Sequence, residues 1–266
     1  MTGRVLIIAG SDSSGGAGIQ ADLKTVTALG GYAATAITAL TAQNTQGVFG
    51  IVGVEPAFIA QQMRLVLEDI GADCLKTGML HNAAVIDTVV AVLETAADGI
   101  PLVVDPVMYA KGGDSLLDPT ARDILSQRLL PRASLITPNI REAEALSGLT
   151  IRKPDDLEAA ARQLLEQGPA AVLVKGGHLA GDMVCDCLAW PGGMEIFTAP
   201  RTSSRNTHGT GCTLASAIAT GLAQAMPLSA AVQRALRYVQ EAIRTAPDLG
   251  QGCGPLHHGH TVQPWH

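Results

Sequence analysis

The chain has 266 residues, which suits one large α/β domain and is marginal for two. Hydrophobic residues make up 47% and charged residues 16%, with 29 glycines, a profile typical of a parallel sheet covered by alanine-rich helices. The formal net charge of −6 argues against nucleic acids and anionic membranes as partners, because both require a positive protein surface.

No targeting or membrane-spanning segment is evident. No run of apolar residues approaches the roughly 20 that a membrane helix needs. The opening MTGRVLIIAG has too short an apolar run for a signal peptide. Five cysteines, an odd number, do not resemble a disulfide framework and favour reduced thiols. We therefore expect a cytoplasmic protein.

Short apolar runs and helical spacing alternate along the chain. They predict strands at residues 4–9, 33–42, 102–105, 134–139 and 171–177, and helices at 17–31, 56–71 and 82–99. Residues 182–200 predict a β-hairpin around the turn PGG, either crossing the sheet edge or leading into the last loop. The alternation predicts βαβ units, a mainly parallel sheet and a single domain over residues 1–266. In such sheets ligands bind beyond the carboxyl ends of the strands.

The first motif at such an end is AGSDSSGGAGIQAD, residues 9–22. Gly15, Gly16 and Gly18 would let the backbone approach a ligand, and the helix that follows favours an anion or a hydroxyl oxygen. The motif lacks the Lys-Ser or Lys-Thr of a P-loop and fits the dinucleotide pattern poorly. A flexible turn that binds nothing is equally compatible with it.

Two further motifs carry carboxylates. Asp105, in VVDPVM, follows a buried run and is placed either to hold a metal ion or to cap the next element. In TPNIREAE, Asn139 and Glu142 are three residues apart, so at a helix start they face one side and suit Mg²⁺ or its waters. The same spacing is that of a capping box, which the residues alone favour.

The last two motifs are basic or glycine-rich. Lys175, in VKGGH, ends a predicted strand and is either a phosphate-facing ammonium or a solvated lysine. In NTHGTGCTLASA, Gly209 and Gly211 permit a tight turn whose amides converge on one anion, aided by the helix dipole. Cys212 follows directly. A helix N-terminus lowers the pKa of a thiol, so a base, a small packing residue and a nucleophile served by His208 all stay open.

Two other clusters are discounted as metal sites. Cys185 and Cys187 are two apart on a predicted strand, but no second pair completes a zinc site. The histidine-rich segment 257–266 is expected to pack or fray at the end of the chain.

Together the motifs resemble the ribokinase-like superfamily and, within it, the hydroxymethylpyrimidine/phosphomethylpyrimidine kinases of thiamine biosynthesis. The resemblance covers essentially the whole chain. It is carried by AGSDSSGGAGIQADLKT, ITALTAQNTQGV, KTGML, LLPRASLITPN, VLVKGGH, NTHGTGCTLASAIA and GPLHHGH. It implies an α/β three-layer sandwich with a central, mostly parallel sheet flanked by helices. It also implies ATP as phosphoryl donor, Mg²⁺, and successive phosphorylation of 4-amino-5-hydroxymethyl-2-methylpyrimidine and its monophosphate.

The resemblance also assigns residues. Gln43 would read the pyrimidine, since its amide can donate to a ring nitrogen and accept from the 4-amino group. The other pocket residues would be Gly10, Asp22, Met79 and Val107. Gly209, Thr210 and Gly211 would form the anion hole. The nucleotide and its Mg²⁺ would be held by Lys175, Asn139, Glu142, Thr207 and Gly209, with Asp105 and Glu142 as metal ligands, partly through water.

The sugar kinases of the superfamily carry Asp at the position of Cys212. The resemblance implies that a cysteine at this position is typical of the pyrimidine kinases. We hypothesise that its thiolate accepts the alcohol proton in the first reaction. The second acceptor, a phosphate oxygen, is already ionised and would be repelled by a fixed carboxylate.

Other functions remain open from the sequence. A pyridoxal or dual-specificity kinase of the same superfamily is the nearest alternative. A ligand-binding regulator without turnover and a cysteine hydrolase belong to other classes. The resemblance further implies a homodimer acting on a small-molecule substrate.

Overall fold

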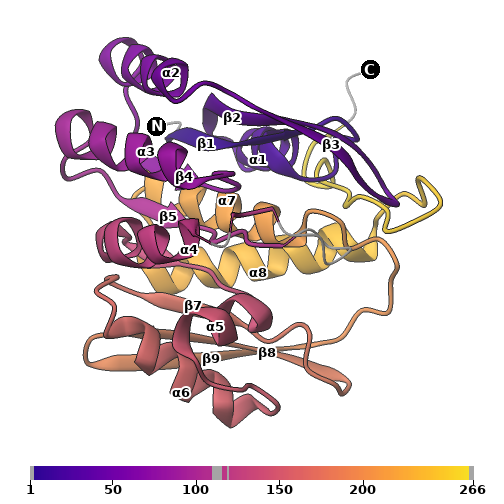
Figure 1. Ribbon diagram of the computed structural model, residues 1–266. Coiled ribbons are helices and arrows are strands. Elements are labelled where there is room, and N and C mark those ends of the chain that lie inside the picture. Colours follow the sequence, from indigo (N-terminus) through magenta and orange to yellow (C-terminus); the bar gives the residue numbers. More distant parts are fainter. Residues whose placement is uncertain (1–2, 110–115, 119, 264–266) are drawn as a thin grey trace.

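The computed structural model describes residues 3–109, 116–118 and 120–263. Nine strands in these residues form one sheet in the order β3-β2-β1-β4-β5-β6-β7-β8-β9. In chain order they are β1 (Arg4–Asp12), β2 (Tyr32–Asn44), β3 (Gly47–Gly53), β4 (Cys74–Thr77), β5 (Leu102–Val104), β6 (Leu135–Ile136), β7 (Val172–Lys175), β8 (Met183–Trp190) and β9 (Gly193–Pro200). Figure 1 shows the order running from β3 and β2 at the top to β8 and β9 at the bottom.

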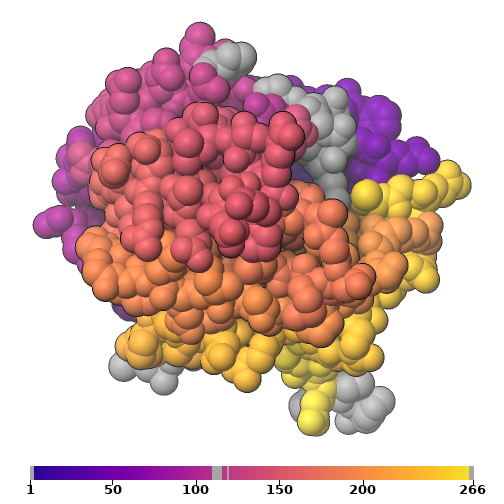
Figure 2. Space-filling view, turned by 90° about the horizontal axis from the view of Figure 1, so that it is seen from below, coloured from indigo at the N-terminus to yellow at the C-terminus, as the bar shows by residue number. Residues whose placement is uncertain are grey.

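The centre of the sheet is parallel and its two edges are antiparallel. Strands β2, β1, β4, β5, β6 and β7 pair in parallel. At one edge β3 pairs antiparallel with β2, and at the other β7, β8 and β9 form an antiparallel run. The predicted hairpin is therefore confirmed, and it extends the sheet edge. Its residues, coloured orange, lie near the middle of the face seen from below (Figure 2).

Helices cover both faces of the sheet, which makes three layers (Figure 1). One face packs against α1 (Gly18–Ala28), α7 (Thr210–Ala223) and α8 (Leu228–Arg244). The other packs against α2 (Pro56–Asp69), α3 (Ala83–Ala96), α4 (Ala121–Ile124), α5 (Ile140–Ser147) and α6 (Pro154–Leu165), with a π-helical turn at Leu125–Leu129 and a 3-10 turn at Leu130–Arg132. The expected three-layer α/β sandwich is confirmed.

Strand β1 shows how sequence periodicity builds the two cores. Leu6 and Ile8 belong to the apolar cluster beneath α2–α6, and Val5 and Ile7 to the cluster beneath α1, α7 and α8. All four side chains are buried, because successive residues of a strand face opposite sides of the sheet. Complete burial stabilises the fold by about 1.5–3 kcal/mol for each such side chain.

The described chain ends in the exposed residues 261–263. After α8, residues 245–263 turn back along the helix toward the β2–β3 hairpin, where Cys253 N–H donates to the Thr45 carbonyl at 2.9 Å. Gly254 accepts from His208 N–H at 3.0 Å, and Thr213 Oγ1 lies 3.0 Å from His258 Nε2. The end of the described chain thus holds the loop after β2 against the start of α7. Within the described residues, no helix is long and apolar enough to cross a membrane.

Candidate active site

A cavity of about 1090 Å³ opens at the carboxyl ends of the parallel strands. Most residues singled out from the sequence line it: Gly10, Gln43, Met79, Asp105, Val107, Asn139, Glu142, Lys175, Thr207, Gly209, Thr210, Gly211 and Cys212. The sheet topology explains the clustering, because parallel strands bring their carboxyl ends to one edge. Asp22 is the exception among the predicted site residues.

The turn before α7, predicted to bind an anion, is tight and left-handed at its first glycine. Gly209 has φ 81°, a left-handed conformation that favours glycine. A Cβ there would also lie only 1.9 Å from the Gly16 carbonyl oxygen, so the turn can approach the first glycine-rich loop only without a side chain. The first-turn amides of α7 have no intrahelical acceptors, and the helix dipole favours negative charge there.

Lys175 and Asp105 form an ion pair on the wall of the cavity. Lys175 Nζ donates to Asp105 Oδ1 at 3.0 Å, and Thr137 Oγ1 donates to the same oxygen at 3.1 Å. Burial by itself lowers the pKa of Lys175, but Asp105 and Glu142 outweigh it and raise the pKa. The ammonium therefore stays charged. It lies next to the turn of Gly209, Thr210 and Gly211, called the anion turn below, since a Cβ on Gly211 would be 3.2 Å from Lys175 Nζ.

Asn139 and Glu142 form the capping box that the residues favoured. Glu142 N–H donates to Asn139 Oδ1 at 3.1 Å, and Asn139 N–H donates to Glu142 Oε2 at 2.9 Å. Both residues also line the cavity, so capping does not remove them from the site. Burial raises the pKa of Glu142 to about 7, although Lys175 opposes the shift.

Cys212 differs from the sequence-based expectation. The expected fall in its pKa at a helix start is wrong for this structure: burial raises the pKa of the thiol to about 12, even though Lys76 acts to lower it. The carboxylates Asp22 and Asp105 add to the rise, and Gly18 N–H donates to the sulfur. The thiol is therefore protonated at neutral pH in the structure described.

The expectation that Asp22 lines the ligand pocket also needs correction. Asp22 is fully buried in α1, where both carboxylate oxygens accept from Lys76 Nζ at 2.8 Å. Ser216 Oγ of α7 donates to the same carboxylate at 2.7 Å. The pair joins α1, β4 and α7 beneath the site, so Asp22 acts on the cavity only through the charges that surround Cys212.

Near Gln43 the structure adds a contact that the sequence did not predict. His208 Nε2 lies 2.8 Å from Asp12 Oδ2, and the two residues are 196 positions apart. Burial acts to raise the pKa of Asp12, but hydrogen bonds from His208, Ser14 and Ala17 outweigh it and lower the pKa to about 2. Asp12 lies in the first glycine-rich motif, residues 9–22. Its pairing with His208 could not be predicted without the fold.

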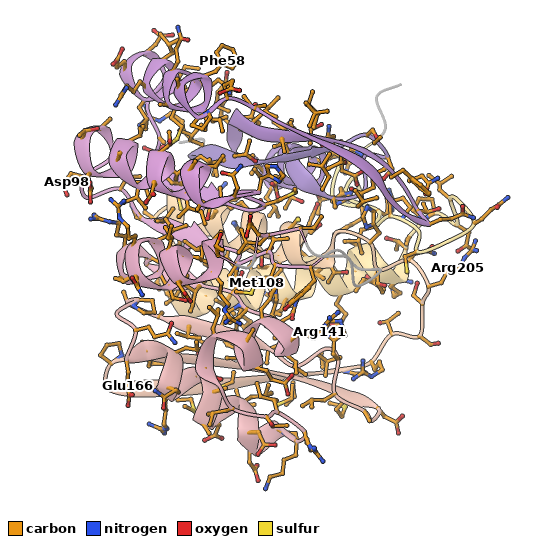
Figure 3. All side chains as sticks on the ribbon, in the orientation of Figure 1. Phe58, Asp98, Met108, Arg141, Glu166 and Arg205 are labelled. Carbon is orange, nitrogen blue, oxygen red and sulfur yellow. The ribbon has the colours of Figure 1, made fainter. Side chains whose placement is uncertain are left out.

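Two further walls of the cavity went unpredicted. Arg141, at the start of α5, stacks over the Tyr109 ring with its guanidinium carbon 4.4 Å from the ring centroid. Figure 3 shows Arg141 and Met108 near the middle of the molecule. On the opposite side, β9 and α8 contribute Phe197 and Arg237. Strand β9 was predicted as part of the hairpin but not as a wall of the cavity, and α8 was not predicted.

Among the described residues no group of three or more His, Cys, Asp or Glu side chains is arranged to hold a metal ion. Cys185 and Cys187 lie on β8 as free thiols. Of the histidine-rich segment 257–266, residues 264–266 lie outside the described chain.

Comparison with known proteins fits this arrangement. The family described as phosphomethylpyrimidine kinase matches residues 12–257, which is most of the chain. The chain belongs to the phosphomethylpyrimidine kinase family. It is 48% identical over 255 residues to the hydroxymethylpyrimidine/phosphomethylpyrimidine kinase of Streptomyces coelicolor, covering 96% of this chain and 94% of that protein.

A second relative of this family member is longer. The thiamine biosynthesis bifunctional protein ThiED of Geobacter sulfurreducens is 55% identical over 257 residues, which are 96% of this chain but 52% of that protein. The chain thus spans about half the length of that relative.

Solved structures share the fold of this phosphomethylpyrimidine kinase family member. A phosphomethylpyrimidine kinase from Clostridium difficile superposes with a TM-score of 0.80 at 42% identity, covering 90% of this chain and 99% of that one. A Staphylococcus aureus pyridoxal kinase in complex with AMP-PCP and pyridoxal superposes with a TM-score of 0.90 at 33% identity, covering 99% and 96%. The backbone is close to both, and sequence identity is higher to the pyrimidine enzyme.

Proposed function

We propose that the chain is an ATP-dependent kinase of 4-amino-5-hydroxymethyl-2-methylpyrimidine. It forms the monophosphate and then the diphosphate, which serves thiamine diphosphate biosynthesis. One observation carries the proposal. A single cavity is lined both by Gln43, whose side-chain amide can hydrogen-bond a pyrimidine, and by the anion turn followed by Cys212. The family match supports the same reaction.

The residues supply position and charge, which is most of what phosphoryl transfer requires, because its transition state is loose. The proposed acceptor ring lies between Gln43, Gly10, Met79 and Val107, all of which line the cavity. Gly209, Thr210 and Gly211 present backbone amides where charge develops. Lys175 stays ionised beside them and neutralises phosphate charge.

The donor set fits a magnesium nucleotide. Asp105 and Glu142 both line the cavity, and both act electrostatically on Lys175. Carboxylate oxygens and waters are the ligands that Mg²⁺ prefers, so Asp105 and Glu142 would hold the ion, which would neutralise phosphate charge. Asn139 and Thr207 complete the proposed nucleotide side, Asn139 by holding Glu142 through the capping box.

Product analysis tests the proposal. The protein is incubated with MgATP and the pyrimidine alcohol, and the phosphorylated products are separated by chromatography. We expect the monophosphate first and the diphosphate later. ATP consumption that depends on added pyrimidine monophosphate is the sharper result, because a pure pyridoxal kinase has no reason to accept it. Ligand binding without ATP turnover would contradict the proposal.

Pyridoxal phosphorylation is the second candidate activity. It is favoured by the backbone likeness to the pyridoxal kinase, whose TM-score of 0.90 exceeds that of the pyrimidine enzyme. Measuring kcat/KM for pyridoxal and for the pyrimidine alcohol on the same preparation decides between single and dual specificity. We expect the pyrimidine to be preferred.

The assembly is also part of the proposal. We expect a homodimer, supported by apolar side chains that are exposed on one edge: Leu40 at 50%, Phe49 at 71% and Val52 at 66%. Light scattering should give twice the mass of one chain. We also expect residues 1–266 to act as one domain in the cytoplasm. A single cooperative unfolding transition and cell fractionation test these two points.

A further inference from the structure

The side-chain amide of Gln43 lies between two polar neighbours. As placed in the structure, its Oε1 is 3.1 Å from Thr41 Oγ1 and its Nε2 is 3.4 Å from His208 Nε2. The oxygen and nitrogen ends of an amide have nearly the same shape, so the hydrogens of the neighbours decide which end is the acceptor. That choice matters because Gln43 lines the cavity.

The neighbour His208 carries a hydrogen on Nε2. Asp12 Oδ2 lies 2.8 Å from this nitrogen. The Asp12 carboxylate also accepts from Ser14 N–H, Ser14 Oγ–H and Ala17 N–H at 2.7–2.8 Å, as an ionised group does. An unprotonated Nε2 facing this carboxylate would oppose two lone pairs. The Nε2–H therefore donates to Asp12, and Nε2 has no lone pair to accept from the Gln43 NH₂, which favours the amide oxygen on this side.

The hydroxyl of Thr41 favours the same orientation of the Gln43 amide for a separate reason. Its hydroxyl has a single hydrogen, and the Ser11 carbonyl accepts it at 2.9 Å. Toward Gln43, Thr41 Oγ1 then offers only a lone pair. The NH₂ end of the amide belongs on this side. Both neighbours therefore favour the amide turned by 180° from its placement in the structure, with the oxygen toward His208 and the NH₂ toward Thr41.

The His208 ring is itself fixed in place. It is 7% exposed, and its Cδ2 atom would lie 2.3 Å from a Cβ on Gly16. Its backbone N–H donates to the Gly254 carbonyl at 3.0 Å. The ring is thus held between the first glycine-rich loop and the end of the described chain, so the amide is oriented before a ligand arrives.

We propose that His208, oriented by Asp12, is a positioning residue that fixes the direction of the Gln43 amide and so selects the substrate ring. This deepens the proposed function and rests on it. The fixed amide offers an acceptor beside His208 and a donor beside Thr41. A 4-aminopyrimidine presents an amino donor next to a ring-nitrogen acceptor, which is the complementary order. The 4-oxo counterpart, with a carbonyl next to a ring N–H, presents the reverse order and is rejected.

A matched pair of variants tests this inference. In His208→Gln the side-chain Nε2 can still donate to Asp12, whereas His208→Met has a similar length without the donor. We measure kcat/KM for the 4-amino alcohol and its 4-oxo counterpart, and the Kd of each ring by calorimetry without nucleotide. The preference for the 4-amino ring should fall about tenfold in His208→Met, as expected for one oriented hydrogen bond. His208→Gln should keep the preference, and KM for ATP should change in neither variant.

The outcomes separate the two proposals. A wild-type protein that phosphorylates neither pyrimidine contradicts the proposed function. Normal wild-type turnover with an unchanged preference in His208→Met overturns the positioning role alone. An equal loss in both His208 variants overturns it too, because only packing would then matter. If His208→Met does not fold, Thr41→Val and Thr41→Ser decide the matter, since only Thr41→Ser keeps the lone pair that faces the NH₂.

Discussion

Two lysine–aspartate pairs lie at the carboxyl ends of strands, and they differ in their access to the cavity. Lys76, on β4, has both oxygens of Asp22 at 2.8 Å, and neither side chain is exposed. Lys175, at the end of β7, contacts one oxygen of Asp105 at 3.0 Å and keeps 13% of its side chain exposed at the cavity. Similar residues in similar positions thus present one sealed pair and one open pair.

The difference shows that burial, not residue type, separates support from chemistry here. Burial by itself lowers the pKa of Lys76, but Asp22, Cys212 and Asp105 raise it to about 12, so the lysine remains charged within the core. The sealed pair does not line the cavity and acts there through its charge on Cys212 and Asp105. The open pair can contact a phosphate directly. Both Lys76 and Lys175 interact electrostatically with Cys212.

The sealed pair should matter most for stability. In Lys76→Met, the Asp22 carboxylate stays buried without its cation, and we expect the free energy of unfolding to fall by about 3–5 kcal/mol. Urea unfolding followed by circular dichroism measures it. The double variant Lys76→Met/Asp22→Asn should recover part of the loss, because no unpaired charge remains. A single variant as stable as the wild type would show that the pair is dispensable.

The open pair should matter most for turnover. In Lys175→Met, we expect kcat to fall about 10²–10³-fold, because a preorganised cation at the proposed phosphoryl site is lost. The change in stability should be smaller than for Lys76→Met, because Asp105 still accepts from Thr137 and borders the cavity. Steady-state kinetics and urea unfolding on the same preparation check both. The comparison fails if Lys175→Met loses stability and keeps its kcat.

Cys212→Ser tests what the thiol between the two pairs contributes. If the thiol gives up its proton in the substrate complex and acts as a base, the first phosphorylation should slow by about 10²-fold. The second should change little, because its phosphate acceptor is already ionised. Separate rates with the alcohol and with the monophosphate give the answer. Equal losses in both reactions would leave only the size and neutrality of Cys212 as its role.

The pH dependence of Cys212 alkylation should show the smallest effect. Burial raises the pKa of this thiol to about 12. Below that pH the thiolate fraction, and with it the rate of reaction with iodoacetamide, should rise about tenfold per pH unit between pH 7 and 9. Peptide mass spectrometry separates Cys212 from the other cysteines. A labelling rate that is already constant near pH 7 would indicate an ionised thiol and would contradict this structural inference.

Much of the fold could be predicted because its local signals agree. Strands β1 and β7 combine short apolar runs with glycine stops, and the β8–β9 hairpin surrounds a glycine turn. Strand β4 was missed because its sequence CLKT contains Lys76, whose charge is neutralised by Asp22, 54 residues away. Strand β3 was missed because three of its seven residues are glycine.

The site was predicted in outline because its residues follow strands, and strand ends meet at one edge. The prediction for Asp22 was wrong for a physical reason. Asp22 is the last residue of the motif that lines the cavity, but its place on α1 directs its side chain to Lys76. The predicted fall in the pKa of Cys212 was wrong because it considered the helix dipole alone. Burial of the thiol is the largest effect on this pKa and raises it. Neither orientation nor desolvation can be read from residue spacing.

The contact between Asp12 and His208 has a consequence for how the protein folds. It spans 196 residues, so the loop that it closes is about three quarters of the described chain. Contacts this distant are slow to form, because their closure entropy must be overcome before they contribute. We therefore expect the end of the cavity near Gln43 to be among the last parts to assemble. A ligand that requires it will bind only molecules that have finished folding, and the binding rate after dilution from denaturant will report that final step.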